Sequence, residues 1–400
     1  MRLPAKGANR TVEKAPRVVV AAGGTAGHVV PAMAVADELR ASGAVVSFLG
    51  TAERIEAELV PAAGYEIDFL KVRGIDRRNP LRAAVAVGEA VGAVGAARRA
   101  LQRREADVVL GGGGYVAGPA GLAAVSSRTP LVLTEADSHL GLANRLLAGR
   151  ARRVCLAFPI EGREGDPYLV TGRPVPAAIL RADRAAARRR FGIAPDARCL
   201  LVMGGSQGAR SINQAAIEAF AEAGSGGLDA EFRRDFHVIH LSGRRDHDEL
   251  EQRLVAASHA TDYTLLPYEP DLGNVLAACD LVLARSGGSI FEVVAAGRPA
   301  ILVPYPYATA DHQAANAAWM SGAGAAETIP DEALSASLLA GRVSSLFEDE
   351  SRLAAMAQAS AALAKPEAAR TIADEVLVAA GRPASGAPYA PLGSKRRTGT

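Results

Sequence analysis

Two short glycine-rich segments constrain the fold of this chain more than any other feature. They are GGTAG at residues 23–27 and GGSQG at residues 204–208. Each follows an apolar run typical of a buried parallel strand, VVV at 18–20 and LLV at 200–202. Glycine lets the backbone approach a ligand closely, and the free N–H groups of a following helix favour a phosphate. The repeated arrangement predicts two similar halves, each with a phosphate-binding turn.

Short β-branched runs alternate with longer helical periodicities through both halves of the chain. This alternation predicts parallel sheets wrapped by helices. We therefore expect an α/β protein with two Rossmann-like domains whose parallel sheets face each other across a cleft. In the first half, strands are expected at residues 18–21, 45–49, 65–72, 108–110, 130–133, 153–157 and 168–170. In the second half, they are expected from residue 199 and at residues 237–241, 263–266, 281–284 and 300–303.

The segment GRPVP at residues 172–176 breaks both periodicities and is the expected linker. We expect an N-terminal domain over residues 16–176 and a C-terminal domain over residues 177–365. Two helices are expected near the end of the chain with no strand between them. The second of these, over residues 366–380, is expected to cross back and brace the first domain.

The composition is that of an ordinary globular protein. The chain has 400 residues, of which 49% are hydrophobic, and a formal charge of +2, so no nucleic-acid partner is expected. The cysteines Cys155, Cys199 and Cys279 stand in apolar patterns and predict buried thiols in a reducing cytoplasm. Residues 1–15 lack the apolar core of a secretory signal and predict a flexible leader. Residues 381–400, rich in Gly, Pro and Ser, predict a disordered tail.

Six segments carry a resemblance to a known family from about residue 17 to residue 380. They are GGTAGHVVPAMAVADEL (23–39), GGGYVAGPAGLAA (112–124), GLANRLLA (141–148), TGRPV (171–175), GGSQGAR (204–210) and RSGGSIFEVVAAGRPAILVPYP with ADHQAANA (285–306 and 310–317). Their order and spacing resemble the MurG family, the peripheral membrane N-acetylglucosaminyltransferases of bacterial peptidoglycan synthesis. The resemblance implies the GT-B type of fold, no cofactor and no metal. It also implies that the N-terminal domain, residues 16–176, binds a lipid-linked muramoyl-peptide acceptor, and that the C-terminal domain, residues 177–365, binds UDP-N-acetylglucosamine as donor.

The same resemblance implies roles for individual residues. Those implied for UDP-N-acetylglucosamine are Thr25, Ala26, Gly27, Ser206, Gln207, Gly288, Ser289, Glu292 and Gln313. Within this set, the second glycine-rich turn would hold the UDP phosphates, Glu292 the ribose hydroxyls, and Gln313 the donor sugar. Residues expected to contact the acceptor are Gly113, Tyr115 and Asn144.

The catalytic base has two candidates. His28 closes the first turn at the start of a helix, where the helix dipole disfavours the imidazolium and so favours a proton-accepting ring. An alternative is that His28 only caps the helix or hydrogen-bonds a phosphate. Asp137 is the second candidate because it adds a carboxylate where the family usually has an Asn.

The chain departs from the family pattern at three further places. Ala26 replaces a usual Gly, which backbone contact tolerates only if φ is negative there. Pro176 stands where an Arg usually follows the linker, and Arg173 is a candidate for the missing cation. The segment 285–292 is one residue shorter than in commonly seen members.

Two charged features need separate interpretation. Asp246 and Asp248 open a helix, so capping of its N–H groups is favoured over metal binding. A basic and apolar cluster in the first half is consistent with a solvated helix entrance or an interfacial patch. Because the implied acceptor is a lipid, we expect peripheral, weak contact with the cytoplasmic face of the cell membrane. The cluster consists of Arg73, Ile75, Arg77, Arg78, Leu81, Arg82 and Val85.

The expected activity is inverting transfer of N-acetylglucosamine from UDP to the 4-hydroxyl of a lipid-diphosphate-linked N-acetylmuramoyl-pentapeptide. This is the step from lipid I to lipid II. Three alternatives stay open: a related transferase with a soluble acceptor, a UDP-N-acetylglucosamine epimerase, and an inactive nucleotide-sugar-binding protein. Product analysis distinguishes them.

Overall fold

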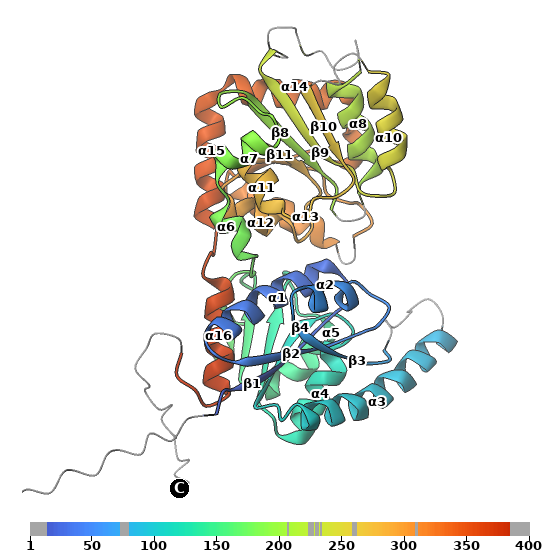
Figure 1. Ribbon diagram of the computed structural model, residues 1–400, viewed down its shortest axis with the longest axis vertical. Helices are drawn as coiled ribbons and strands as arrows, with labels where there is room; N and C mark the ends of the chain where they lie inside the picture. Colours follow the sequence, from blue (N-terminus) through green and yellow to red (C-terminus); the bar gives the residue numbers. More distant parts are fainter. Residues whose placement is uncertain are drawn as a thin grey trace, which may run out of the picture.

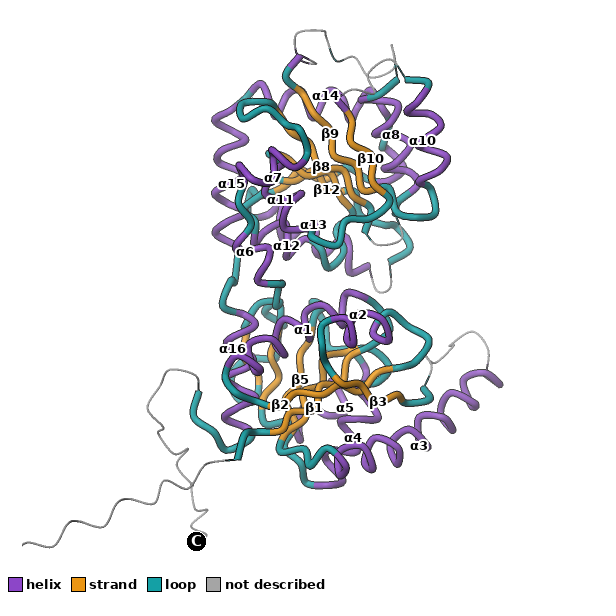
Figure 2. Tube along the Cα trace, in the orientation of Figure 1, coloured by secondary structure: helices purple, strands orange, loops and turns teal. Residues whose placement is uncertain are grey.

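A computed structural model shows two sheet-containing bodies joined by two chain crossings (Figure 1). Helices flank the strands in both bodies (Figure 2). The structure describes residues 14–72, 80–205, 208–222, 228, 232, 234–257, 262–308 and 311–384, without the side chains of residues 80–87 and 90.

The first sheet has seven parallel strands in the order β3-β2-β1-β4-β5-β6-β7. Its central strand β1 lies between β2 and β4, with Val18 paired to Val46 on one side and to Val108 on the other. The inner strands β1, β4, β5 and β6 are mostly buried, as expected of a parallel sheet covered by helices, whereas the edge strands β3 and β7 are partly exposed. Their bounds are β1 Arg17–Ala22, β2 Val45–Gly50, β3 Glu66–Phe69, β4 Val108–Gly113, β5 Leu131–Glu135, β6 Arg153–Leu156 and β7 Tyr168–Val170.

The helices of the first domain cover both faces of this sheet. They are α1 Ala26–Ala41, α2 Glu56–Ala62, α3 Pro80–Arg103, α4 Ala117–Ser127 and α5 Leu142–Leu147. The last helix of the chain, α16 (Ala368–Ala379), also packs here, beside α1 (Figure 1). Its Ile372 and Val376 are buried in one cluster with Val18 and Val20 of β1.

The second sheet has six parallel strands in the order β10-β9-β8-β11-β12-β13. Its central strand β8 pairs with β9 and β11, with Leu201 opposite Ile239 and Val282. The bounds are β8 Arg198–Met203, β9 Phe236–Leu241, β10 Tyr263–Leu266, β11 Leu281–Ala284, β12 Ala300–Leu302 and β13 Ala326–Thr328. Two parallel sheets with helices confirm the predicted α/β class. The strand β13 was not predicted from the sequence.

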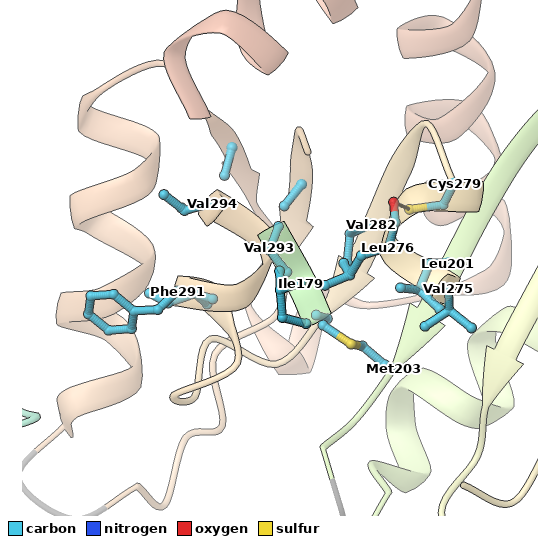
Figure 3. Packing of buried hydrophobic residues seen from close by; sticks show 14 of the residues in the cluster. Ile179, Leu201, Met203, Val275, Leu276, Cys279, Val282, Phe291, Val293 and Val294 are labelled. Carbon is cyan, nitrogen blue, oxygen red and sulfur yellow. Dashed lines mark hydrogen bonds between the residues drawn. The ribbon is translucent and has the colours of Figure 1, made fainter. Parts of the chain in front are cut away.

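The second sheet is covered by α6 Ala177–Arg181, α7 Arg184–Arg190, α8 Arg210–Phe220, α10 His247–Val255, α11 Leu272–Ala278, α12 Ile290–Ala295, α13 His312–Gly322, α14 Ala336–Glu348 and α15 Glu350–Leu363. One face of its core is shown in Figure 3, where Ile179 from α6 lies among Leu201, Val282 and Val293. Short 3-10 turns lie at Ala148–Arg150 and Asp331–Ala333. The three cysteines are free and buried, as predicted.

The two crossings between the domains run side by side. One is the segment after β7 and the other joins α15 to α16. At the point of approach, a Cβ on Gly172 would lie 2.5 Å from the Cβ of Lys365. The first domain also contributes Phe158, whose ring lies 4.9 Å from Phe291 and 5.2 Å from Trp319 between centroids. The junction between the two domains therefore has its own apolar packing.

Some sequence expectations fall outside the described residues. These are the leader before residue 14, the tail after residue 384, and the basic positions Arg73, Arg77 and Arg78 with Ile75. The other three members of the cluster lie in the part of α3, residues 80–87, whose side chains are not described. They are Leu81, Arg82 and Val85. No helix in the described chain combines the length and apolarity needed to cross a membrane.

Candidate active site

The first glycine-rich segment connects β1 to α1. Thr25 is the N-cap residue of the helix, and the His28 N–H donates to the Thr25 carbonyl at 3.0 Å. Ala26 begins the helix with a negative φ, the condition under which Ala is tolerated in this turn. Gly27 and His28 therefore lie in the first helical turn, at the positive end of the helix dipole.

A buried carboxylate shapes this turn. Glu56, at the start of α2, is fully buried, and its Oε2 accepts the Gly24 N–H at 3.0 Å. Its Oε1 accepts the N–H and the hydroxyl of Thr51 at 3.0 and 2.6 Å. Glu56 thus ties the first turn to the end of β2. Sequence reasoning missed this residue, because a single Glu early in a helix resembles an ordinary helix-dipole contact.

The His28 ring is held between two turns. Its Nδ1 lies 3.3 Å from the Thr25 hydroxyl oxygen. On the other side lies Gly113 at the end of β4, where φ is +102° and a Cβ would come within 2.5 Å of the ring carbon Cδ2. Burial, and then the charge of Arg173, lower the pKa of His28, while Asp137 and Glu56 act in the opposite direction. The ring is therefore neutral at pH 7 and able to accept a proton.

Asp137 follows β5 in a turn organised by Glu135. The Glu135 carboxylate accepts the N–H groups of Asp137 and Gly141 at 3.2 and 2.8 Å and the side-chain amide of Asn144 at 2.9 Å. Burial raises the pKa of Glu135, and these hydrogen bonds oppose the rise. Asn144 is buried and also donates to the Thr134 carbonyl, so it orders the turn that carries Asp137. Its contact with an acceptor stays a prediction.

The exposed Tyr115 lies close to the first turn, with its ring 3.9 Å from the position a Cβ would take on Gly24. A Cβ on Gly114 would collide with the Gly23 carbonyl, so the two turns approach closely here. The turns after β1 and β4 therefore interlock, as expected for neighbouring parallel strands. A role for Tyr115 and Gly113 in acceptor binding remains an expectation.

The second glycine-rich segment leads from β8 to α8. Gly208 has φ +74° and packs against the Ser242 carbonyl, where a Cβ would collide with backbone. Ser206 and Gln207 lie outside the described residues, so their predicted contact with the UDP phosphates is not placed.

A buried polar network lies beneath this turn. The Asn213 amide donates to the Ser242 carbonyl at 2.9 Å and to Asp246 at 3.0 Å, and its oxygen lies 3.0 Å from His240. The other ring nitrogen of His240 lies 2.7 Å from the Tyr263 hydroxyl. Burial lowers the pKa of His240 to about 3, so this network holds a neutral imidazole.

Asp246 does not cap α10 through its side chain, contrary to the sequence expectation. Its carboxylate is taken by Asn213 and Arg245 instead. These contacts are favoured over a helix cap because they satisfy both oxygens of a buried carboxylate. His, Cys, Asp and Glu side chains in the described ranges form no group of three or more that would suit a metal ion.

The turn after β11 and the start of α12 supply the remaining donor-site candidates. Gly288 and Ser289 precede α12, and Glu292 lies in its first turn. Gln313 is the second residue of α13, where its side-chain oxygen accepts the Tyr305 N–H at 2.9 Å and its carbonyl accepts the Ser286 hydroxyl at 2.7 Å. In Figure 1, α12 and α13 lie at the end of the second domain that faces α1 and α2.

Arg173 connects this turn to the first domain. Its guanidinium donates to the Gly27 carbonyl and lies against Gly288, where a Cβ would be 2.5 Å from Nη2. Burial raises the pKa of Glu292 to about 7, and the positive charge of Arg173 opposes that rise. The structure thus gathers His28, Arg173 and Glu292 from both domains and the linker into one electrostatically coupled site.

Comparisons with known proteins identify the family. The glycosyltransferase family 28 N-terminal domain matches residues 18–156, and its C-terminal domain matches residues 199–372. A UDP-N-acetylglucosamine--N-acetylmuramyl-(pentapeptide) pyrophosphoryl-undecaprenol N-acetylglucosamine transferase from Moorella thermoacetica is 38% identical over 373 residues, covering 90% of this chain and 98% of its own length. The chain belongs to the MurG family.

Further MurG relatives give the same picture. The Mycolicibacterium paratuberculosis protein of the same name is 42% identical over 372 residues, covering 90% of this chain and 88% of its own. The crystal structure of Acinetobacter baumannii MurG matches with a TM-score of 0.69 at 26% identity, covering 91% of this chain and all of that one. The resemblance predicted from the six segments, and the GT-B architecture it implied, are therefore confirmed.

Proposed function

We propose that this chain transfers N-acetylglucosamine from UDP-N-acetylglucosamine to the 4-hydroxyl of a lipid-diphosphate-linked N-acetylmuramoyl-pentapeptide. The observation that carries this proposal is identity of about 40% over nine-tenths of the chain with relatives named for that reaction. The site geometry agrees, because a neutral His28 lies within the electrostatic influence of Arg173, whose guanidinium contacts Gly27 of the first glycine-rich turn and lies against Gly288 before α12.

The proposed chemistry is a single in-line displacement. The acceptor oxygen attacks the anomeric carbon, the bond from that carbon to the UDP oxygen breaks, and the configuration inverts. His28, with Asp137 as the alternative base, takes the proton of the acceptor hydroxyl. The diphosphate leaves with the negative charge, which the N–H groups of the second turn and the start of α8 stabilise.

Incubation of the purified protein with labelled UDP-N-acetylglucosamine tests the proposal. With the lipid-linked muramoyl peptide present, label is expected in a β-1,4-linked disaccharide, and UDP is released in equal amount. The same incubation without acceptor, and with a water-soluble muramoyl peptide, separates the alternatives. An epimerised nucleotide sugar, or transfer only to the soluble compound, would contradict the proposal, and bound but unconverted donor would indicate an inactive sensor.

We further propose peripheral association with the cytoplasmic face of the cell membrane. Three leucines on α4 and α5 are exposed, with Leu122 at 47%, Leu142 at 48% and Leu146 at 66%. The exposed Arg145 lies on α5, the short helix that carries Leu142 and Leu146. Apolar side chains beside a cation suit the interface of an anionic leaflet.

Vesicle flotation tests this association. The protein is expected to float with vesicles of phosphatidylglycerol and phosphatidylethanolamine, and less with zwitterionic ones. The double substitution Leu142→Ser with Leu146→Ser is expected to reduce flotation. Val255→Ser, at a residue 83% exposed in the second domain, is the matched control. Equal flotation of both variants would remove α5 from the membrane contact.

A further inference from the structure

Arg173 is the second residue of the linker, directly after Gly172. A guanidinium offers five N–H donors, and Nη2 of Arg173 donates to the main-chain oxygen of Gly27 in the first glycine-rich turn. A side chain from the linker therefore reaches the place where α1 begins, beside His28.

The same guanidinium touches the second domain. A Cβ on Gly288 would lie 2.5 Å from Nη2 and 2.9 Å from Cζ, so the turn before α12 can approach this closely only as glycine. Cζ also lies 5.5 Å from the centre of the Phe291 ring, which packs against it from α12. Arg173 is thus enclosed between the turns of both domains.

The charge of Arg173 has no direct counter-ion in the described part of the chain. Three carboxylates favour the charged form of Arg173, in decreasing order Glu292, Asp137 and Glu135. None of them forms an ion pair or hydrogen bond with the guanidinium. Burial lowers the pKa of the guanidinium, although arginine stays protonated in proteins. A half-buried cation with spare N–H donors and a planar fork suits an oxyanion such as phosphate.

We infer that Arg173 is a substrate-binding residue that holds a diphosphate group at the junction of the two domains. The inference rests on the proposed function, in which both substrates carry a diphosphate: the nucleotide sugar next to its sugar, and the lipid acceptor next to its muramoyl group. The guanidinium lies within reach of either, because it contacts a turn from each domain.

Binding of UDP and of uridine by Arg173→Gln tests the inference for the donor. If Arg173 holds the donor diphosphate, UDP affinity falls at least about tenfold, the size expected for a lost charge-assisted hydrogen bond. Uridine affinity stays within about twofold of wild type, because the nucleoside carries no phosphate. Arg173→Lys keeps the charge without the planar fork, so its UDP affinity is expected to lie between those of wild type and Arg173→Gln.

Steady-state kinetics provide the acceptor arm. If Arg173 holds the acceptor diphosphate, the KM for the lipid-linked acceptor rises at least about tenfold in Arg173→Gln while UDP affinity is unchanged. Either result supports the inference and identifies the substrate concerned.

The inference is overturned if UDP and uridine weaken to the same extent with an unchanged acceptor KM, since that pattern indicates a purely structural tie between domains. It is also overturned if every constant stays within about twofold of wild type. Arg181→Gln, at an exposed position at the end of α6, is the matched control. A wild-type protein that binds UDP but transfers no sugar would instead contradict the proposed function, and the UDP and uridine titrations would still decide the donor arm.

Discussion

The two glycine-rich turns share a sequence pattern and a place in the fold, but they are supported differently. The first, between β1 and α1, is held by the ionisable Glu56 and carries His28 in the helix it opens. The second, between β8 and α8, is held by contact of Gly208 with the Ser242 carbonyl. The network below it contains an imidazole that stays neutral.

We expect this difference to give the two turns separate tasks. A proton-transferring group needs a pKa set by neighbouring charges, and the first turn has Glu56, Asp137 and Arg173 near His28. A phosphate-binding turn needs N–H groups in fixed positions, and backbone packing around Gly208 supplies that rigidity. Changes in the first turn should therefore affect turnover, and changes in the second should affect nucleotide affinity.

The largest expected effect is on turnover by His28→Ala. Loss of the base is expected to lower kcat at least about 100-fold, with UDP affinity nearly unchanged because the second turn is untouched. Transfer of labelled sugar and titration with UDP measure the two effects. His237→Ala is the control, because His237 lies at the amino end of β9 and its Nε2 lies 2.9 Å from the Thr264 hydroxyl oxygen. Unaltered turnover in His28→Ala would leave Asp137 as the base.

Gly208→Ala is expected to affect the second glycine-rich turn and nucleotide binding. A methyl group would collide with the Ser242 carbonyl at φ +74°, so unfolding free energy should fall by about 2–4 kcal/mol and UDP affinity by roughly tenfold. Urea unfolding and UDP titration measure both. Gly43→Ala, with φ +85° and space for a Cβ, controls for backbone strain alone and should cost about 1–2 kcal/mol without affecting UDP. If both variants bind UDP equally, backbone packing at Gly208 does not shape the nucleotide site.

Glu56→Gln tests the support of the first turn. The amide can accept from Thr51 but then presents its NH2 to the Gly24 N–H, so two donors face each other. We expect a loss of about 1–3 kcal/mol in unfolding free energy and roughly a tenfold loss in turnover, with UDP affinity kept. Glu58→Gln, at an exposed position of α2, should change neither quantity. A loss of UDP affinity equal to the loss of turnover would show that the two turns are not separable.

The smallest expected effect is a pH dependence of donor affinity. Because the pKa of Glu292 is about 7 in the free protein, a growing fraction of this group is protonated as pH falls below 7. If its carboxylate accepts ribose hydroxyls, affinity should be about fourfold lower at pH 6.5 than at pH 8. UDP-N-acetylglucosamine is the proper probe, since its diphosphate has no terminal phosphate that titrates in this range. Glu292→Gln should bind with no such dependence, and a persistent dependence in that variant would assign it to another group.

The sequence by itself determined the two sheets, the two glycine-rich turns and the place of His28 at the start of a helix. These features are local, since each follows from a run of β-branched residues, a glycine cluster and the helix pattern after it. The MurG resemblance also rested on local sequence, the six short segments, and the comparisons with known proteins confirmed it.

The tertiary structure alone decided which distant residues complete the site. Glu56 reaches Gly24, and Gly113 reaches His28, because β2 and β4 both lie beside β1 in the sheet. Arg173 meets Gly27 and Gly288 because the linker passes between the domains. Strand order and domain packing depend on contacts between residues far apart in the chain, so no local pattern reveals them.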